Sequence, residues 1–301
     1  MQNPPFRGVL SAITTPFHDD DTVDHGSLAQ SARWQLDAGC SGIIPLGSLG
    51  EGATLELDEK VAVVRTLVAA CGDAPVLPGI AAASTRGAVA LAKAVAAAGA
   101  RGLMVLPPYV HKGGMHEALA HVAAVIGATG LPCMLYNNPP AYGTDFTPPC
   151  IAELASAHDE LVAVKESSGD ARRVTAVKAL LGDRLDVLAG MDDMIVEGVA
   201  AGATGWVAGL VNALPEESVR LFELARAGHT AAAADLYRWF LPLLRLDTVP
   251  EFVQLIKLVQ QEVGRGSERV RAPRLLLHGA AREQALATIR NALAARPAVS
   301  R

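Results

Sequence analysis

A single lysine, Lys165, stands where a strongly apolar segment ends and a polar segment begins. Leu161-Val162-Ala163-Val164 precedes it, and Glu166-Ser167-Ser168-Gly169-Asp170 follows it. A continuous apolar run of this length is typical of a strand buried on both faces. An amine at the end of such a strand is partly desolvated, which lowers its pKa and favours the nucleophilic neutral form. We therefore predict that Lys165 forms a Schiff base; the alternative is a lysine that extends its charge to the surface.

Three further reactive side chains follow apolar segments: Ser48, Tyr109 and Tyr136. Tyr136 lies about one strand-helix repeat before Lys165, so we expect the phenol and the amine on adjacent strands at the same height. A phenol within reach of an imine can deliver and remove protons, and Ser48 could link that phenol to a relay. Each residue also has a structural explanation, since serine is common in glycine turns and tyrosine at strand ends.

Short apolar runs alternate with amphipathic stretches along the chain. The expected strands are Val9–Thr14, Gly42–Leu46, Pro75–Ile80, Gly102–Leu106, Cys133–Asn137, Leu161–Lys165, Asp186–Ala189 and Gly205–Ala208. The expected helices include Ser27–Ala38, Asp58–Ala70, Arg86–Ala98, His116–Ala128, Arg172–Leu181 and Met194–Ala201, then Glu216–Ala227, Thr230–Arg245, Glu251–Val263 and Ala280–Ala295. This pattern predicts an α/β fold, a (β/α)8 TIM barrel over residues 1–228 with a helical extension of about three helices over residues 229–301. A doubly wound open sheet is the structural alternative.

Composition narrows the class of protein. The 301 residues are 50% hydrophobic, and the formal net charge is −5; an acidic balance argues against a general nucleic-acid partner. No signal peptide or membrane-length apolar segment is evident, so we expect a cytoplasmic protein with no membrane partner. Cys40, Cys71, Cys133 and Cys150 form no close pair, and we expect them to be reduced packing residues.

Seven motifs in order resemble the family of dihydrodipicolinate synthase and N-acetylneuraminate lyase, the class I Schiff-base lyases. They are Thr14-Thr15-Pro16-Phe17, Gly47-Ser48-Leu49-Gly50-Glu51, Leu106-Pro107-Pro108-Tyr109, Tyr136-Asn137-Asn138-Pro139, Val164-Lys165-Glu166-Ser167, Ala189-Gly190-Met191-Asp192-Asp193 and Gly205-Trp206-Val207-Ala208-Gly209. The resemblance implies that Lys165 forms the imine, that Tyr136 is the acid/base phenol, and that Ser48 and Tyr109 complete a relay. It implies no cofactor, and a homotetramer built from dimers in which Tyr109 reaches a neighbouring subunit.

The same resemblance places a small 2-oxo or cyclic imino acid against Gly47, Ser48, Leu49, Asn138, Ala141, Gly190 and Val207. Its carboxylate would rest on the backbone N–H groups of the Ser48-Leu49 turn, an arrangement that binds anions in many proteins.

Two departures from the pattern of the synthase bear on the choice of substrate. Ala141 stands where the synthase carries an arginine for the carboxylate of its second substrate, and Leu49 replaces a hydroxyl residue of the glycine turn. The sequence therefore looks most like the branch of 1-pyrroline-4-hydroxy-2-carboxylate deaminases. The alternatives are 4-hydroxy-tetrahydrodipicolinate synthase or another pyruvate-dependent aldolase.

Other classes of function have weaker support. Glycines near Gly47 and Gly79 could cradle a phosphate, but neither segment has a phosphate-binding motif. His111, His116 and His121 do not share a helix face, so we expect no metal site and interpret them as solvated or loop residues. A catalytically silent ligand-binding barrel is the alternative outside the enzymes, although it would not need Lys165, Tyr136, Ser48 and Tyr109 together.

Overall fold

The computed structural model describes residues 5–298, and in this range eight parallel strands form one sheet. The spatial order of the strands is β2-β1-β8-β7-β6-β5-β4-β3. Their bounds are β1 Gly8–Ala12, β2 Gly42–Ile44, β3 Gly79–Ile80, β4 Leu103–Val105, β5 Cys133–Asn137, β6 Leu161–Glu166, β7 Asp186–Ala189 and β8 Gly205–Ala208.

The sheet closes on itself between β2 and the segment that enters β3. Ile43 pairs in parallel with Val76, and the N–H of Ile43 donates to Pro75 O at 3.0 Å while the N–H of Leu77 donates to Ile43 O at 2.9 Å. These bonds join the two ends of the strand order, so the predicted barrel is confirmed and the open sheet is wrong.

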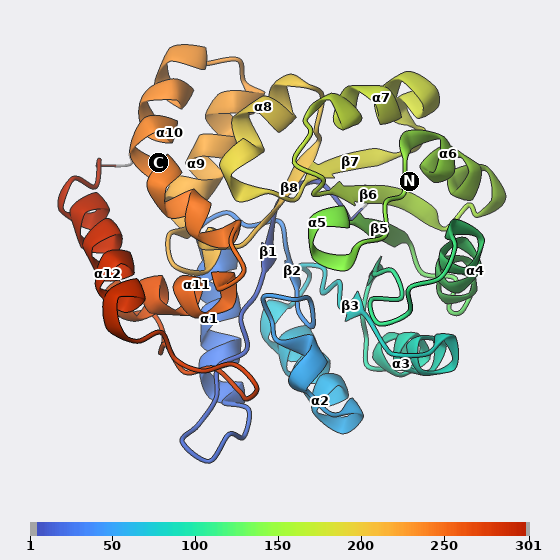
Figure 1. Ribbon diagram of the computed structural model, residues 1–301, viewed down its shortest axis with the longest axis horizontal. Coiled ribbons are helices and arrows are strands. Elements are labelled where there is room, and N and C mark those ends of the chain that lie inside the picture. The colour runs from blue at the N-terminus through green and yellow to red at the C-terminus, as the bar shows by residue number, and fades with distance from the viewer. Residues whose placement is uncertain (1–4, 299–301) are drawn as a thin grey trace.

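Helices surround the barrel in Figure 1. Their bounds are α1 His25–Asp37, α2 Leu57–Cys71, α3 Thr85–Ala97, α4 Met115–Ile126, α5 Pro139–Tyr142, α6 Pro148–Ala157, α7 Arg172–Leu181, α8 Ile195–Ala200 and α9 Pro215–Arg226. Three of them end alike, at Gly39, Gly99 and Gly202, whose φ angles of 109°, 100° and 107° suit glycine. Each of these glycines belongs to an Ala-Gly-x-x-Gly segment, at residues 38–42, 98–102 and 201–205, which ends a helix and leads into the next strand.

The inside of the barrel is filled by alternate residues of the strands. Its buried cluster contains Leu10, Ile44, Leu77, Met104, Met134, Tyr136, Ala163, Leu188 and Val207. Side chains that point inward recur every second residue of a strand. Lys165 lies two residues beyond Ala163, and Tyr136 lies two beyond Met134, so the pleat directs both toward the axis near the carboxyl ends of their strands.

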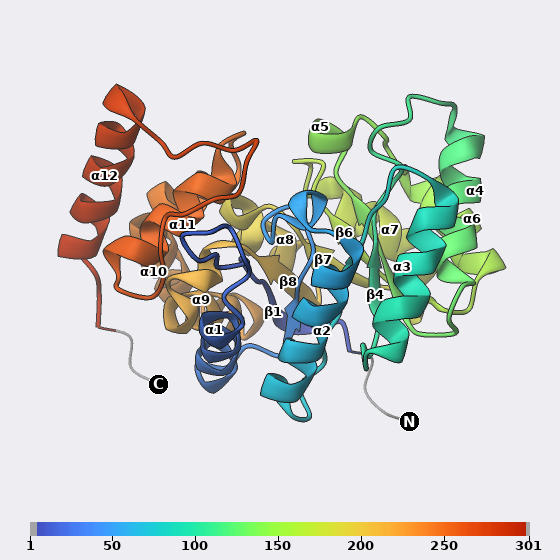
Figure 2. The same ribbon diagram turned by 90° about the horizontal axis from the view of Figure 1, so that it is seen from below.

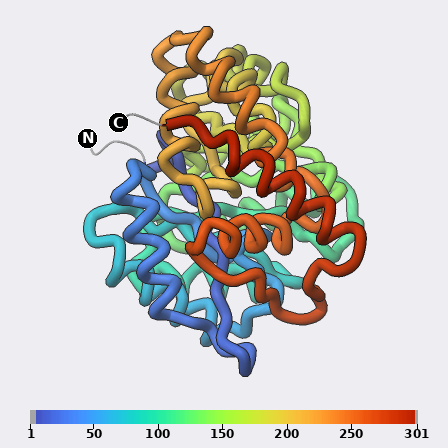
Figure 3. Tube along the Cα trace, turned by 90° about the vertical axis from the view of Figure 1, so that its left-hand side faces the viewer, coloured from blue at the N-terminus to red at the C-terminus, as the bar shows by residue number. Residues whose placement is uncertain are grey.

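Three helices follow the barrel: α10 Thr230–Leu244, α11 Phe252–Glu262 and α12 Gly279–Ala294. They lie to one side of the strand ring in Figure 2, and Figure 3 shows α12 crossing the outer side of α10 and α11. Their apolar faces share one buried cluster with β8 residues such as Trp206 and with α9. None of the helices within residues 5–298 combines the length and apolar character needed to cross a membrane.

The structure corrects some expectations. The third strand is only Gly79–Ile80, shorter than Pro75–Ile80, because Pro75 and Pro78 have no N–H to donate to a ladder. The interpretation of His121 as solvated is wrong, since it is buried on α4 and its Nδ1 lies 2.9 Å from Thr85 Oγ1. The four cysteines are free, and all except Cys150 are buried.

Candidate active site

Lys165 and Tyr136 meet at the carboxyl ends of adjacent strands. They are direct partners in the register between β6 and β5, and Lys165 Nζ lies 4.1 Å from the centre of the Tyr136 ring. The predicted pairing of amine and phenol at one height is confirmed. In a TIM barrel this is the end where active sites form.

The surroundings of Lys165 favour its neutral form. The residue is only 7% exposed, and within residues 5–298 its Nζ takes part in no hydrogen bond. Burial lowers the pKa of this amine, and the charge of Asp247 partly opposes that effect. Gly190 makes room for the side chain, because a Cβ at Gly190 would lie 2.7 Å from Lys165 Cε. A desolvated amine of this kind is a nucleophile for carbonyl and imine carbon.

The phenol of Tyr136 is fixed by Asn138. Asn138 begins helix α5 with its side chain, whose Oδ1 accepts from the Ala141 N–H at 3.1 Å, while its Nδ2 donates to the Tyr136 hydroxyl at 2.9 Å. Burial raises the pKa of Tyr136 to about 12, although the bond from Asn138 lowers it. The phenol is therefore protonated at neutral pH and can donate. Asn138, predicted to bind substrate, here orients the candidate acid.

Ser48 contacts a tyrosine that the sequence analysis did not assign. Its Oγ forms a hydrogen bond with the hydroxyl of Tyr142, the last residue of α5. The Tyr142 ring stands edge-on to Tyr136, 5.6 Å between ring centres. Burial raises the pKa of Tyr142, and the nearby phenols of Tyr136 and Tyr109 raise it further. Within one chain, Ser48, Tyr142 and Tyr136 thus form one group of hydroxyls.

The glycine turn has free donors next to Ser48. Among residues 5–298, the N–H groups of Ser48 and Leu49 donate to no other backbone group. Gly52 closes the turn, and a Cβ there would collide with Leu46 O. Two adjacent unpaired N–H groups in a compact turn are able to bind an anion such as one carboxylate.

A buried ion pair holds this turn from below. Glu51, whose backbone φ is 53°, forms an ion pair with Lys257 of helix α11. The distance between Lys257 Nζ and Glu51 Oε1 is 2.5 Å, and both side chains are essentially buried. Glu51 Oε2 also accepts the Arg271 N–H at 3.0 Å. The C-terminal extension therefore fixes the segment that carries Ser48.

Two buried acids lie on the other side of the lysine. Asp192, in the motif after β7, accepts from Trp206 Nε1 at 2.9 Å and from the N–H groups of Gly209 and Leu210. Burial raises its pKa to about 6, and those hydrogen bonds lower it. Asp247, from the segment after α10, also lies within electrostatic reach of Lys165. Asp192 belonged to a recognised motif, whereas no sequence signal marked Asp247.

The remaining predicted substrate residues are dispersed. Leu49 is buried, and Val207 belongs to the barrel interior with Tyr136. Ala141 is exposed on α5. Tyr109 is partly exposed and near Tyr142 of the same chain; its contribution to a neighbouring subunit stays a prediction.

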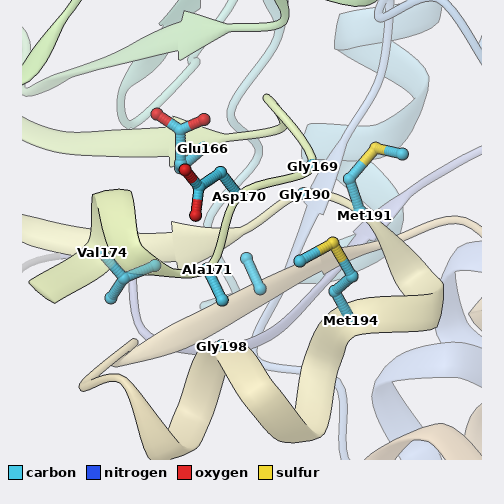
Figure 4. A pocket seen from close by; sticks show the side chains of 10 residues that line it. Glu166, Gly169, Asp170, Ala171, Val174, Gly190, Met191, Met194 and Gly198 are labelled. Carbon is cyan, nitrogen blue, oxygen red and sulfur yellow. The ribbon is translucent and has the colours of Figure 1, made fainter.

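A hollow of about 280 Å³ lies beside Gly190. In Figure 4, Met191 and Met194 lie on one side of it, with Glu166 and Asp170 on the other. Lys165 does not line it, so the geometry of amine, phenol and turn, not this hollow, defines the candidate active site.

Replacing Tyr142 with phenylalanine should slow turnover about 100-fold, because general acid-base groups contribute 10²–10⁴ and Ser48 would lose its hydroxyl partner. Steady-state kinetics of the reaction at this site measures the change. Tyr237→Phe is the matched control, since its hydroxyl contacts Glu197 and Asp193 O and no hydroxyl group of the candidate site. Equal loss in both variants would contradict a role for Tyr142 in the relay.

Comparison with known proteins extends these observations. A family model described as the dihydrodipicolinate synthetase family matches residues 5–292. Curated relatives include 4-hydroxy-tetrahydrodipicolinate synthases of Geobacter metallireducens, 32% identical over 94% of this chain and 97% of that protein, and of Sorangium cellulosum, 33% identical over 99% and 100%.

Solved structures have the same fold. A dihydrodipicolinate synthase from Bacillus anthracis has a TM-score of 0.91 at 25% identity, covering 97% of this chain and 99% of that one. A prophage protein of E. coli K12, described as belonging to the dihydrodipicolinic acid synthase family and solved in complex with pyruvate, has a TM-score of 0.89 at 26% identity, covering 96% and 99%. A monomeric dihydrodipicolinate synthase variant has a TM-score of 0.88 at 26% identity, covering 96% of each chain.

Proposed function

Since the chain belongs to the dihydrodipicolinate synthetase family, whose members are lyases, we propose that it deaminates 1-pyrroline-4-hydroxy-2-carboxylate through an imine on Lys165. The observation that carries the proposal is the site itself, which offers one reactive amine and one turn for a single carboxylate. Ala141 stands where the resemblance implies an arginine for a second carboxylate. A methyl group cannot replace a bidentate, charge-assisted contact of that kind.

The residues suit each step. Lys165 Nζ adds to C2 of the ring, and the C2–N bond breaks as the protein imine forms and the ring nitrogen leaves as an amine. The Tyr136 phenol, held by Asn138, moves protons at the nitrogen and at C3. Elimination of the C4 hydroxyl and hydrolysis of both imines follow. Overall, the pyrroline and one water give ammonia and the semialdehyde of 2-oxoglutarate.

A second candidate is 4-hydroxy-tetrahydrodipicolinate synthase, favoured by the names of the curated relatives. Purified protein given the pyrroline should release ammonia, which a glutamate dehydrogenase assay detects. The same protein given pyruvate and aspartate semialdehyde should form little product. Product from the second pair without ammonia from the first would reject the deaminase and establish the synthase.

We also propose a cytoplasmic homotetramer in which Tyr109 reaches a neighbouring subunit. Val110, next to it, is 62% exposed in the single chain, as expected for a residue that a partner covers. Sedimentation velocity measures the assembly, and a monomer would reject this proposal. One of the similar solved structures is described as a monomeric variant, so the test has two real outcomes.

A further inference from the structure

Asp247 brings a carboxyl group from the C-terminal extension to the mouth of the barrel. Helix α10 ends at Leu244, and a short turn of 3-10 helix, Arg245–Asp247, follows. This turn packs on the segment Asp192–Met194 after β7. The carboxyl of Asp247 lies directly over Gly209 after β8, where a Cβ would overlap both of its oxygens. Asp247 therefore sits above the ends of β7 and β8, beside the strand that carries Lys165.

One oxygen of this carboxyl has no partner. Oδ1 of Asp247 is buried and forms no hydrogen bond with any group of residues 5–298. A buried polar atom without a partner is uncommon and calls for an explanation, of which a catalytic role is one. A substrate hydroxyl at this place would supply the missing partner.

The other acid whose charge acts on Lys165, Asp192, already has hydrogen-bond partners. Asp192 accepts from Trp206 Nε1 and from the N–H groups of Gly209 and Leu210. Tyr136 is bound by Asn138, and Ser48 by Tyr142. Of these groups, Asp247 alone has a buried oxygen free for a substrate.

The charges around Asp247 keep its proton available. Burial raises the pKa of Asp247 well above its ordinary value, and the carboxylates of Asp192 and Asp193 raise it further, whereas Lys165 lowers it. After Lys165 has formed an imine with its substrate, the carboxylate of Asp192 still raises the pKa of Asp247. Such an acid is protonated more often than an exposed aspartate and can donate.

We propose that Asp247 is the catalytic acid that protonates the hydroxyl leaving from the carbon β to the imine. This inference rests on the proposed function and specifies its substrates as 4-hydroxy-2-oxo acids and their cyclic imines. In the step, the enamine nitrogen pair reforms C2=N, the C2=C3 pair moves to C3=C4, and the C4–O bond breaks. The Asp247 proton goes to the departing oxygen, which leaves as water. The proton earlier removed from C3 replaces it, so no further reactant is required.

The test separates imine formation from expulsion of the hydroxyl. In Asp247→Asn, borohydride trapping of pyruvate on Lys165 should stay within about twofold of the unmodified protein. Ammonia release from the pyrroline should fall about 100-fold or more, the contribution of a general acid. Gly209→Ala should have the same effect, because the new methyl displaces the carboxyl, and it tests the idea even where Asp247→Asn fails to fold.

Asp235→Asn is the matched control, an exposed aspartate of α10 that pairs with Arg238, and it should change neither reaction. The inference is overturned where Asp247→Asn releases ammonia normally, or where it loses the pyruvate adduct to the same degree as turnover. Absence of ammonia with the unmodified protein rejects the proposed deaminase instead. In that case the role of Asp247 is tested with 4-hydroxy-2-oxobutanoate, whose dehydration gives an ultraviolet-absorbing enone. If the unmodified protein does not dehydrate this compound, the inference about Asp247 is overturned as well.

Discussion

Lys165→Met should lose the covalent adduct completely. With pyruvate and borohydride, the unmodified protein should gain the mass of one reduced pyruvate on the peptide that contains Lys165, and the variant should gain none. The reason is that this amine is buried, close to the Tyr136 phenol and free of hydrogen bonds within residues 5–298, the environment of a nucleophilic lysine. Lys165→Ala should behave in the same way. Intact-protein and peptide mass spectrometry measure the adduct.

Lys93→Met provides the control, because Lys93 is exposed on α3 and its loss should leave the adduct unchanged. An adduct that persists in Lys165→Met would place the imine elsewhere and reject the candidate site.

The lowered pKa of Lys165 sets the direction in which the rate of imine formation and the stability of the fold change with pH. Because burial lowers the pKa of Lys165 from 10.5, the rate of imine formation should rise with pH and reach half its maximum below 10.5. The same shift means that the folded protein binds fewer protons than the unfolded chain between the lowered pKa and 10.5. Lys165 thus costs stability at low pH, and the cost disappears as the pH rises through that interval.

Lys257→Met should destabilise the fold by about 3–5 kcal/mol, the usual cost of removing one member of a buried ion pair. Glu51 would keep its charge in the interior, with the Arg271 N–H at 3.0 Å and the Arg274 side chain at 3.7 Å. Two backbone carbonyls, Thr15 O and Arg269 O, would also lose the ammonium that now donates to them. Urea unfolding with linear extrapolation measures the change in the free energy of unfolding.

The matched substitution Lys178→Met removes a surface pair of a partly buried lysine with the exposed Asp183 and should cost less than about 1 kcal/mol. Adding Glu51→Gln to Lys257→Met should recover part of the lost stability, because the unpaired charge is then gone. Equal effects of Lys257→Met and Lys178→Met would show that the buried pair does not hold the glycine turn.

The strands were predictable because burial on both faces leaves a simple pattern. Cys133–Asn137, Asp186–Ala189 and Gly205–Ala208 have the predicted bounds. Helix α6, Pro148–Ala157, was not among the predicted helices, because two prolines at its start resemble a loop, although proline is favoured at the first helical position. Proline also shortened β3, where its missing N–H interrupts the ladder.

The candidate site was predictable only where its residues lie on strands or in motifs. Lys165 and Tyr136 follow from the period of two along β6 and β5 and from parallel register. Asn138 was predicted as a substrate-binding residue, and its contact with the Tyr136 hydroxyl was not. Tyr142 and Asp247 were not predicted, because they lie in the four-residue helix α5 and in the turn after α10. Segments this short show no hydrophobic period, so no spacing in the sequence could indicate which side chain reaches which group.

The amino-acid sequence by itself determined the barrel, the family resemblance and the reactive lysine, because alternation of buried and polar segments is a local property that the chain displays directly. Only the tertiary structure decided that Asn138 orients the phenol, that Ser48 pairs with Tyr142, and that Lys257 and Asp247 reach the barrel mouth from the helical extension. The contact of Asn138 with Tyr136 is local and depends on how the chain turns from β5 into α5. The other contacts join segments far apart in the chain, and they exist because closing the barrel and packing the extension against it bring those segments together.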